Sequence, residues 1–185
     1  MMKKFEEKTI HSTSIFKGRV ISLKVDEVTL PNGKTSNREI INHPGAVAVI
    51  ALTDDNKIIL VEQYRKALER SIIEIPAGKL EKGEEPLETA KRELEEETGY
   101  VAEEITYLQS FATSPGFADE IIHLYVAKHL SVVEEKKQLD EDEFVELLEV
   151  TLEEAEQLET KKKIYDAKTA FAIIWLKLYL SKETR

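Results

Sequence analysis

The chain has 185 residues, 42% of them hydrophobic, which suits one globular domain or a compact core with a small extension. Its formal net charge of -10 argues against nucleic acid or an anionic membrane surface as a partner. The chain has no cysteine for a disulfide framework, no apolar run long enough to span a membrane, and no secretory signal at its start, so we expect a cytoplasmic location.

The first third of the chain predicts strands. Residues 7–43 alternate polar and apolar side chains, and the sequence PNGK at 31–34 predicts a tight turn between two of the strands. Two apolar runs follow at 46–52 and 57–63, separated by the turn sequence TDDN. Because these runs are apolar on both faces, we expect them to be central strands of a second sheet.

The last part of the chain predicts strands and then helices. ITYLQSF and EIIHLYVAKHL predict two strands that flank the loop ATSPGFAD, and FVELLEV predicts another. Thr151 can cap the following helix, with Glu154 three residues later in the position of a capping box. A final helix is expected over 166–181. Its apolar side chains at helical spacing, expected in the core or at a subunit interface, are Ala170, Phe171, Ile174, Trp175 and Leu178.

Between these parts lies the most informative segment, GKLEKGEEPLETAKRELEEETGY at 78–100. Pro86 suits the first turn of a helix, where its missing N–H costs nothing, and Gly99 can adopt the left-handed conformation that ends one. The residues between them are mostly strong helix formers. At about 3.6 residues per turn the apolar positions form one stripe. This stripe consists of Leu87, Ala90 and Leu94.

Another face of this helix carries carboxylates. Glu93 and Glu97 stand one turn apart, with Glu96 beside them, so a cation is expected among these like charges. Hard oxygen ligands suit Mg²⁺ or Mn²⁺, whereas zinc would call for His or Cys. Arg92 can hold one of the carboxylates in place. The alternative for so charged a chain is a Glu-rich helix with a solvated face.

The spacing resembles the signature of the Nudix hydrolase family: Gly, five residues, Glu, seven residues, Arg-Glu, an apolar residue, any residue, Glu-Glu, any residue, Gly, and an apolar residue. The matching positions are Gly78, Glu84, Arg92, Glu93, Leu94, Glu96, Glu97 and Gly99. The one departure is Tyr100, which is aromatic where an aliphatic residue is usual. The resemblance covers most of residues 44–181.

The resemblance implies an α/β (α+β) fold, a Nudix-type α/β/α sandwich with a mixed sheet. We accordingly expect an N-terminal antiparallel β extension over 1–43 and the hydrolase domain over 44–185. It also implies that Glu93 and Glu97 are the principal metal ligands, with Glu96, a catalytic candidate, and the Ala77 carbonyl beside them. Glu84 and Arg92 would brace the loop and the helix.

Features outside the signature indicate a substrate class. Pro115, fifteen residues beyond Tyr100, resembles a marker of the ADP-ribose pyrophosphatase branch, although a Pro-Gly pair also marks ordinary turns. Ser114 and Glu120 match polar residues that this branch uses around the terminal ribose and the diphosphate. In the same branch a comparable N-terminal sheet is exchanged across a homodimer and helps to bind the adenine.

The acidic run LDEDEF at 139–144 is ambiguous, because such a run is usually a solvated loop. In ADP-ribose pyrophosphatases a Glu-x-Glu loop at this point supplies a catalytic carboxylate and a further metal ligand, roles that Glu141 and Glu143 match respectively. No periodicity fixes the register of a loop. The neighbouring acids that could replace them are Asp140, Asp142 and Glu146.

The resulting hypothesis is a Mg²⁺-dependent hydrolase, tolerant of Mn²⁺, that cleaves ADP-ribose to AMP and ribose 5-phosphate. Arg38 and Arg65 are the candidates to hold phosphate or ribose, unless they form surface ion pairs. The expected partner is a small nucleoside diphosphate sugar. A pyrophosphatase for another such sugar, for example GDP-mannose, and a non-catalytic protein that senses a nucleotide are the alternatives.

Overall fold

The computed structural model describes residues 4–133 and 144–183. The chain divides into two compact units. The first comprises Met1–Gly45 together with Phe111–Ile122, and the second comprises Ala46–Ser110 and His123–Arg185. The first unit therefore contains a segment from the second half of the chain in addition to the N-terminal strands.

Three antiparallel strands form the sheet of the first unit. They are β1 (Lys8–Lys17), β2 (Ser22–Thr29) and β3 (Thr35–Asn42), in the order β1-β2-β3. The predicted turn at 31–34 joins β2 to β3, and Gly33 adopts the positive φ of 80° that this turn requires. The Leu30 N–H closes the turn by donating to the Lys34 carbonyl at 2.7 Å. The strands and the turn expected over 7–43 are thus confirmed.

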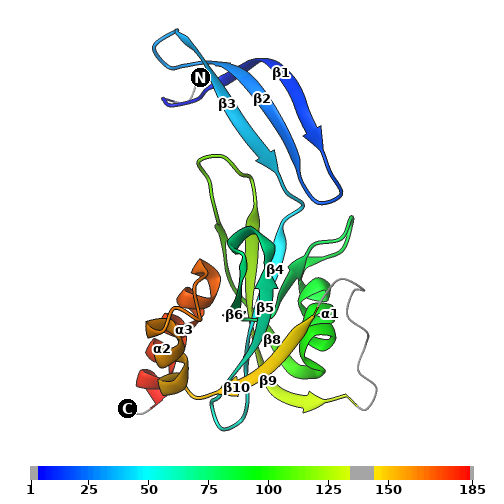
Figure 1. Ribbon diagram of the computed structural model, residues 1–185, viewed down its shortest axis with the longest axis vertical. Coiled ribbons are helices and arrows are strands. Elements are labelled where there is room, and N and C mark those ends of the chain that lie inside the picture. The colour runs from blue at the N-terminus through cyan, green and yellow to red at the C-terminus, as the bar shows by residue number, and fades with distance from the viewer. Residues whose placement is uncertain (1–3, 134–143, 184–185) are drawn as a thin grey trace. The chain divides into compact units, whose positions relative to one another are not determined.

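A seven-stranded mixed sheet forms the centre of the second unit (Figure 1). Its main order is β10-β5-β4-β9-β8, with β6 paired to β5 and β7 paired to β4. The bounds are β4 (Ala46–Leu52), β5 (Ile58–Arg65), β6 (Arg70–Glu74), β7 (Ala77–Lys79), β8 (Tyr100–Ala112), β9 (Ile121–Val132) and β10 (Val145–Val150). A short 3-10 helix, η1 (Lys66–Leu68), lies in the turn between β5 and β6.

The sheet branches between its two central strands. β4 and β5 pair only at Ala51 and Leu52, which lie opposite Ile59 and Ile58. Beyond this point β6 pairs with β5, while β7 pairs with the first half of β4. The chain crosses the branch at Pro76, whose carbonyl accepts a hydrogen bond from Val49 N at 2.9 Å. The crossing delivers the signature segment to the branch point.

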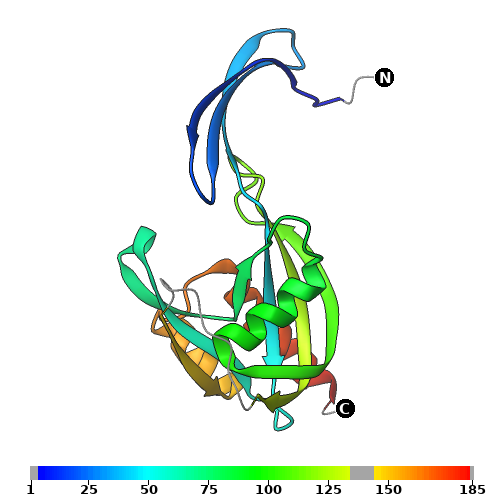
Figure 2. The same ribbon diagram turned by 90° about the vertical axis from the view of Figure 1, so that its right-hand side faces the viewer.

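Helices cover both faces of this sheet (Figure 1, Figure 2). On one face lies α1 (Pro86–Thr98), and on the other lie α2 (Leu152–Thr160) and α3 (Ala167–Glu183). The predicted bounds of α1 are confirmed, because Pro86 opens it and Gly99 ends it with φ 74°. Its apolar stripe packs on the sheet as expected, in a core cluster with Val47, Val49, Ala51, Ile59, Tyr125 and Ala127.

The two C-terminal helices confirm one prediction and correct another. Thr151 and Glu154 form the expected capping box at the start of α2. The stripe predicted for α3 is not in the core, since the side chains of Ile174 and Leu178 are each 58% exposed. The Thr169 hydroxyl accepts the Ile75 N–H at 3.0 Å, so α3 turns a different face inward. That inner face consists of Thr169, Ala172, Ile173 and Leu176. The subunit-interface alternative for the outer stripe stays a prediction.

No helix in the described ranges is both long and apolar enough to cross a membrane.

Candidate functional site

The signature glycine lies directly beneath a carboxylate. The Glu93 side chain occupies the space where a Cβ on Gly78 would be, with its Cδ 1.8 Å and its Oε1 1.9 Å from that position. Because Gly78 has no side chain, β7 and α1 can approach closely enough to bury Glu93, which is only 8% exposed. A Cβ in this position would clash with the carboxylate. The first residue of the signature is therefore explained by packing against Glu93.

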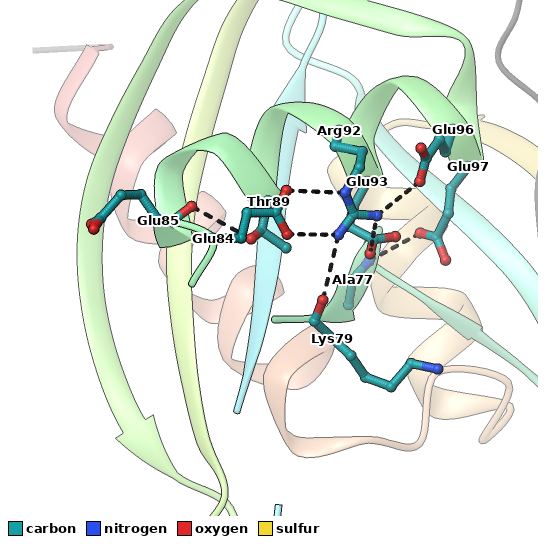
Figure 3. Close-up of polar contacts among 9 residues, drawn as sticks. All are labelled: Ala77, Lys79, Glu84, Glu85, Thr89, Arg92, Glu93, Glu96 and Glu97. Atoms are coloured by element: carbon teal, nitrogen blue, oxygen red, sulfur yellow. Dashed lines mark hydrogen bonds and ion pairs between the residues drawn. The ribbon is translucent and has the colours of Figure 1, made fainter. Parts of the chain in front are cut away.

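Arg92 lies at the centre of the charged residues of the signature (Figure 3). Its Nε and Nη2 donate to the two oxygens of Glu84, both at 3.1 Å. Its Nη1 donates to Glu93 Oε1 at 2.8 Å and to Glu96 Oε2 at 2.9 Å. Nη2 also reaches the Lys79 carbonyl at 3.4 Å. One planar guanidinium thus joins α1 to the loop before it, which is the bracing expected for Arg92 and Glu84.

The carboxylate of Glu97 faces the crossing loop. Its Oε2 accepts a hydrogen bond from Ala77 N at 2.9 Å, and the residue is only 3% exposed. The structure therefore brings Glu93, Glu96, Glu97 and the Ala77 backbone together around one turn of α1 and the start of β7 (Figure 3). A buried carboxylate that accepts a backbone N–H has a fixed orientation, which a ligand for a cation requires.

Electrostatics favour the charged forms of Glu84 and Arg92. The hydrogen bonds from Arg92 lower the pKa of Glu84 below its ordinary value of 4.5, although burial opposes them. The same hydrogen bonds to Glu84, followed by the charge of Glu93, raise the pKa of Arg92 despite its desolvation. The guanidinium consequently remains positive at any pH at which the protein is folded.

Arg65 is held by a buried acid. Its Nε donates to Glu74 Oε2 at 2.5 Å, and Glu74 is only 3% exposed. The second oxygen of Glu74 accepts a hydrogen bond from Lys168 Nζ. Lys168 also donates to Asp166 Oδ1 at 2.9 Å. The ion pair that sequence reasoning held open for Arg65 is therefore present, and its partner is buried.

Three of the predicted substrate residues belong to the first unit. Arg38 forms a two-pronged ion pair with Glu7, at 2.8 and 2.6 Å, so an ion pair is present here too. Ser114 and Glu120 lie at the two ends of the loop between β8 and β9. The Thr113 hydroxyl donates to Glu120 Oε2 at 2.5 Å. The structure does not join Arg38 directly to either loop residue.

The remaining two predicted residues, Glu141 and Glu143, lie outside the described residues. Within the ranges that the structure describes, no three acidic or histidine side chains are arranged to hold a metal ion. The physical reason is that the Arg92 guanidinium lies between Glu93 and Glu96, and that Glu97 accepts the Ala77 N–H. The donor types nevertheless fit a hard divalent cation, because all are oxygens and two of the carboxylates are more than nine-tenths buried.

Comparison with known proteins decides the family. A NUDIX domain model matches residues 42–171. The chain belongs to the Nudix hydrolase family. A second model, a nucleoside diphosphate sugar hydrolase N-terminal domain, matches residues 7–41. Nudix ADP-ribose pyrophosphatases generally use a divalent metal ion.

Two relatives are similar over almost the whole Nudix chain. A methanol dehydrogenase activator of Bacillus methanolicus is 67% identical over 178 residues, with 96% of both chains covered. An ADP-ribose pyrophosphatase of Bacillus subtilis (strain 168) is 64% identical over 177 residues, again with 96% of both chains covered. A crystal structure of an ADP compounds hydrolase matches the fold with a TM-score of 0.85 at 21% identity, over 99% of this chain and 98% of the other.

Sequence reasoning missed Glu74 and Lys168. The available signal was the run SIIEIP, in which one acid stands among isoleucines that are 0–2% exposed in the structure. A charge in such a run needs a buried partner. No local pattern could name that partner, because Lys168 is 94 residues further along the chain.

Replacing Gly78 with alanine tests the packing against Glu93. We expect Gly78→Ala to fold, because the clash is with the end of a flexible side chain, but to displace the Glu93 carboxylate. Because Glu93 is a proposed metal ligand, its displacement should weaken metal binding at least as much as the loss of an outer-shell partner, about 10- to 100-fold. Titration calorimetry with Mn²⁺ measures this loss. Gly116→Ala, where an added Cβ has nothing within 4 Å, is the matched control for stability. Unaltered Mn²⁺ affinity would contradict the packing argument.

The Glu84–Arg92 pair predicts a pH dependence of stability. Since the pKa of folded Glu84 lies below 4.5, its contribution is fully present above pH 4.5 and is lost as the pH falls through the folded-state value. We expect Glu84→Gln to lower the free energy of unfolding at pH 7 by about 1.5 kcal/mol, and this difference to shrink on acidification. Urea unfolding at a series of pH values measures it. Glu81→Gln, at an exposed position in the same loop, is the control. A pH-independent difference would exclude the linkage.

Proposed function

We propose that this Nudix hydrolase is a Mg²⁺-dependent ADP-ribose pyrophosphatase in which Mn²⁺ can substitute. The observation that carries the proposal is the pair of buried carboxylates, Glu93 and Glu97, held against the Ala77–Gly78 backbone by fixed contacts. The name of the Bacillus subtilis relative, which is 64% identical, supports ADP-ribose as the substrate. The match to a nucleoside diphosphate sugar hydrolase N-terminal domain supports the substrate class.

The residues that would hold the metal are Glu93, Glu96, Glu97 and the Ala77 carbonyl, with Glu143 as a further ligand. Bound divalent ions would supply positive charge to the diphosphate oxygens and would lower the pKa of a coordinated water. Arg92 would hold Glu93 and Glu96 in place, since its Nη1 donates to both. Glu96 is the more exposed of these carboxylates and stays a candidate for a catalytic role.

In the proposed reaction a water oxygen attacks one phosphorus of the diphosphate, and the bond from that phosphorus to the bridging oxygen breaks. Glu141 would accept the proton of the attacking water at its carboxylate. The products are AMP and ribose 5-phosphate, whichever phosphorus is attacked. Glu143 and Glu146 are the alternative bases if the register of this acidic run differs.

The other proposed roles concern substrate and assembly. Arg65 would bind the diphosphate, and Arg38, Ser114 and Glu120 would bind the remaining polar groups of the substrate. We further propose a cytoplasmic homodimer in which the extension over 1–43 contributes to dimerisation and to binding of the base. A monomer in sedimentation equilibrium would exclude the dimer.

Two alternatives remain open, another nucleoside diphosphate sugar such as GDP-mannose and a regulatory role. The relative named methanol dehydrogenase activator, at 67% identity, favours the second. Mixing the protein with methanol dehydrogenase discriminates the two roles. Activation that survives in Glu97→Gln would indicate a non-catalytic, nucleotide-sensing regulator, whereas activation lost in that variant would depend on hydrolysis.

Product analysis tests the proposed function. Incubation with ADP-ribose and Mg²⁺ should yield AMP and ribose 5-phosphate in equal amounts, resolved by ion-exchange chromatography. GDP-mannose and an oxidised nucleoside triphosphate are the parallel substrates. In Glu97→Gln the loss of one ligand charge should lower turnover at least about 100-fold while the fold is kept. Faster cleavage of GDP-mannose would contradict the assignment of ADP-ribose as the substrate. Wild-type turnover in Glu97→Gln would contradict the assignment of the metal site.

Substitutions in the acidic run test the general base. We expect Glu141→Gln to lower kcat about 100-fold or more, because the amide cannot accept the proton. The acidic limb of the pH profile of kcat should disappear in the same variant. Glu143→Gln is the matched comparison, since its proposed role is metal binding: a raised Mg²⁺ requirement is expected instead. If Glu143→Gln lowered kcat and Glu141→Gln raised the Mg²⁺ requirement, the assigned register of the acidic run would be wrong.

A further inference from the structure

One group of charges in the second unit has no role in the metal site. It consists of Arg65, Glu74, Asp166 and Lys168, which we call the Glu74 cluster. Glu74 is 3% exposed and Lys168 is 8% exposed, so both are removed from water. Asp166 holds Lys168 and also accepts the Thr169 N–H at 3.1 Å, which fixes the cluster to the first turn of α3. The cluster is therefore anchored to rigid elements.

Arg65 is the exposed end of the cluster. Its side chain is 41% exposed, although its Nε is bonded to the buried Glu74. The planar fork of two Nη groups is left for another ligand, because neither has a hydrogen-bond partner among the residues that the structure describes. Such a fork matches the oxygens of a phosphate or carboxylate. Since both oxygens of Glu74 are occupied, Arg65 cannot rotate without breaking a buried hydrogen bond.

Strand geometry places Arg65 and Glu74 on one face of the β5–β6 hairpin. In the β5–β6 ladder Val61 lies opposite Glu74, and Arg65 lies opposite Arg70. Opposed residues share a face and alternate residues along a strand share a face, so Arg65 and Glu74 lie on the same face of the hairpin. Ile59, on that face of β5, belongs to the core beneath α1. Arg65 thus continues the face of β5 to which Ile59 belongs, while Lys168 reaches Glu74 from the first turn of α3.

We propose that Glu74, fixed by Lys168, is a positioning residue that orients the Arg65 guanidinium to bind the substrate diphosphate. The proposal rests on the proposed function for its ligand, but not for the geometry of the cluster. With two cations and two carboxylates inside the cluster, an incoming phosphate oxygen is attracted only if Arg65 presents its donors correctly. Orientation, rather than net charge, then determines affinity.

A double-mutant cycle tests the proposal. Arg65→Ala should raise the KM for ADP-ribose about 30-fold, and Glu74→Gln should raise it about 10-fold. In both variants kcat should change less than about threefold, because hydrogen bonds made equally in the ground and transition states affect KM and not kcat. In the double variant Glu74→Gln should add no more than about twofold to the effect of Arg65→Ala, since it acts through that residue. Glu62→Gln is the matched control, an acid on the other face of β5 that lies 3.8 Å from Lys163.

The outcomes separate this proposal from the proposed function. If the two effects multiply in the double variant, Glu74 does not act through Arg65 and the proposal is overturned. If Glu74→Gln fails to fold, the Arg65→Lys variant is measured instead, because a lysine cannot both bond Glu74 and present a fork of donors. Its KM is expected to be about tenfold higher, the effect of losing about one charged hydrogen bond. A wild-type KM in Arg65→Lys would overturn the proposal. If the wild-type protein does not cleave ADP-ribose, the proposed function fails. The same cycle is then measured on the Kd for ADP-ribose by calorimetry, where absent binding or absent coupling overturns the positioning role.

Discussion

The site depends on the hydrogen bonds and ion pairs that Arg92 forms with the surrounding carboxylates. Three carboxylates, Glu84, Glu93 and Glu96, share this one guanidinium, and two of them also lie one turn apart on the same helix. Without a cation they would repel one another, and burial of Glu93 would favour its neutral form. A lysine could supply the charge but not the planar set of donors that reaches three carboxylates in fixed directions. The arginine therefore offsets the charge of the carboxylates and fixes their geometry.

The contacts of Arg92 also require β7 to lie close to α1. Arg92 ties α1 to the loop through Glu84, and Gly78 lets the helix come near enough for Glu93 to fill the space of a missing side chain. At the other end Gly99 ends α1 in a left-handed conformation and passes the chain directly into β8. The glycines of the signature are thus explained by steric constraints, and its charged residues by electrostatics, and each depends on the other.

Local signals predicted most of the fold. Pro86 and Gly99 marked the ends of α1, and Thr151 marked the start of α2, because capping and turn chemistry depend on adjacent residues. The inward face of α3 could not be predicted the same way. The helix itself was predicted correctly, but two of its faces carry apolar side chains at helical spacing. The hydrogen bond from Ile75 to Thr169 determines which face packs against the sheet. Contacts between distant segments, like this one, leave no periodicity in the sequence.

For the candidate site, too, local residues could be predicted from the sequence and contacts between distant segments could not. Residues inside the signature could be assigned from spacing, since one helix fixes their relative positions. The partners of Arg38 and Arg65 could not, because Glu7 and Glu74 reach them through strand pairing and side-chain conformation. For a single arginine, the sequence alone does not distinguish an ion pair from a ligand.

The burial of Glu74 and Lys168 needs an explanation other than stability. Removing two charges from water costs several kcal/mol per ion in broad terms, and a well-packed apolar pair of the same volume is often as stable or more so. Glu74 stands between buried isoleucines along the chain, but its own side chain contacts Arg65 and Lys168. A fixed carboxylate does what an apolar residue cannot, since it restrains the direction of an exposed guanidinium. The cost of burying this pair is therefore consistent with a requirement for orientation at Arg65.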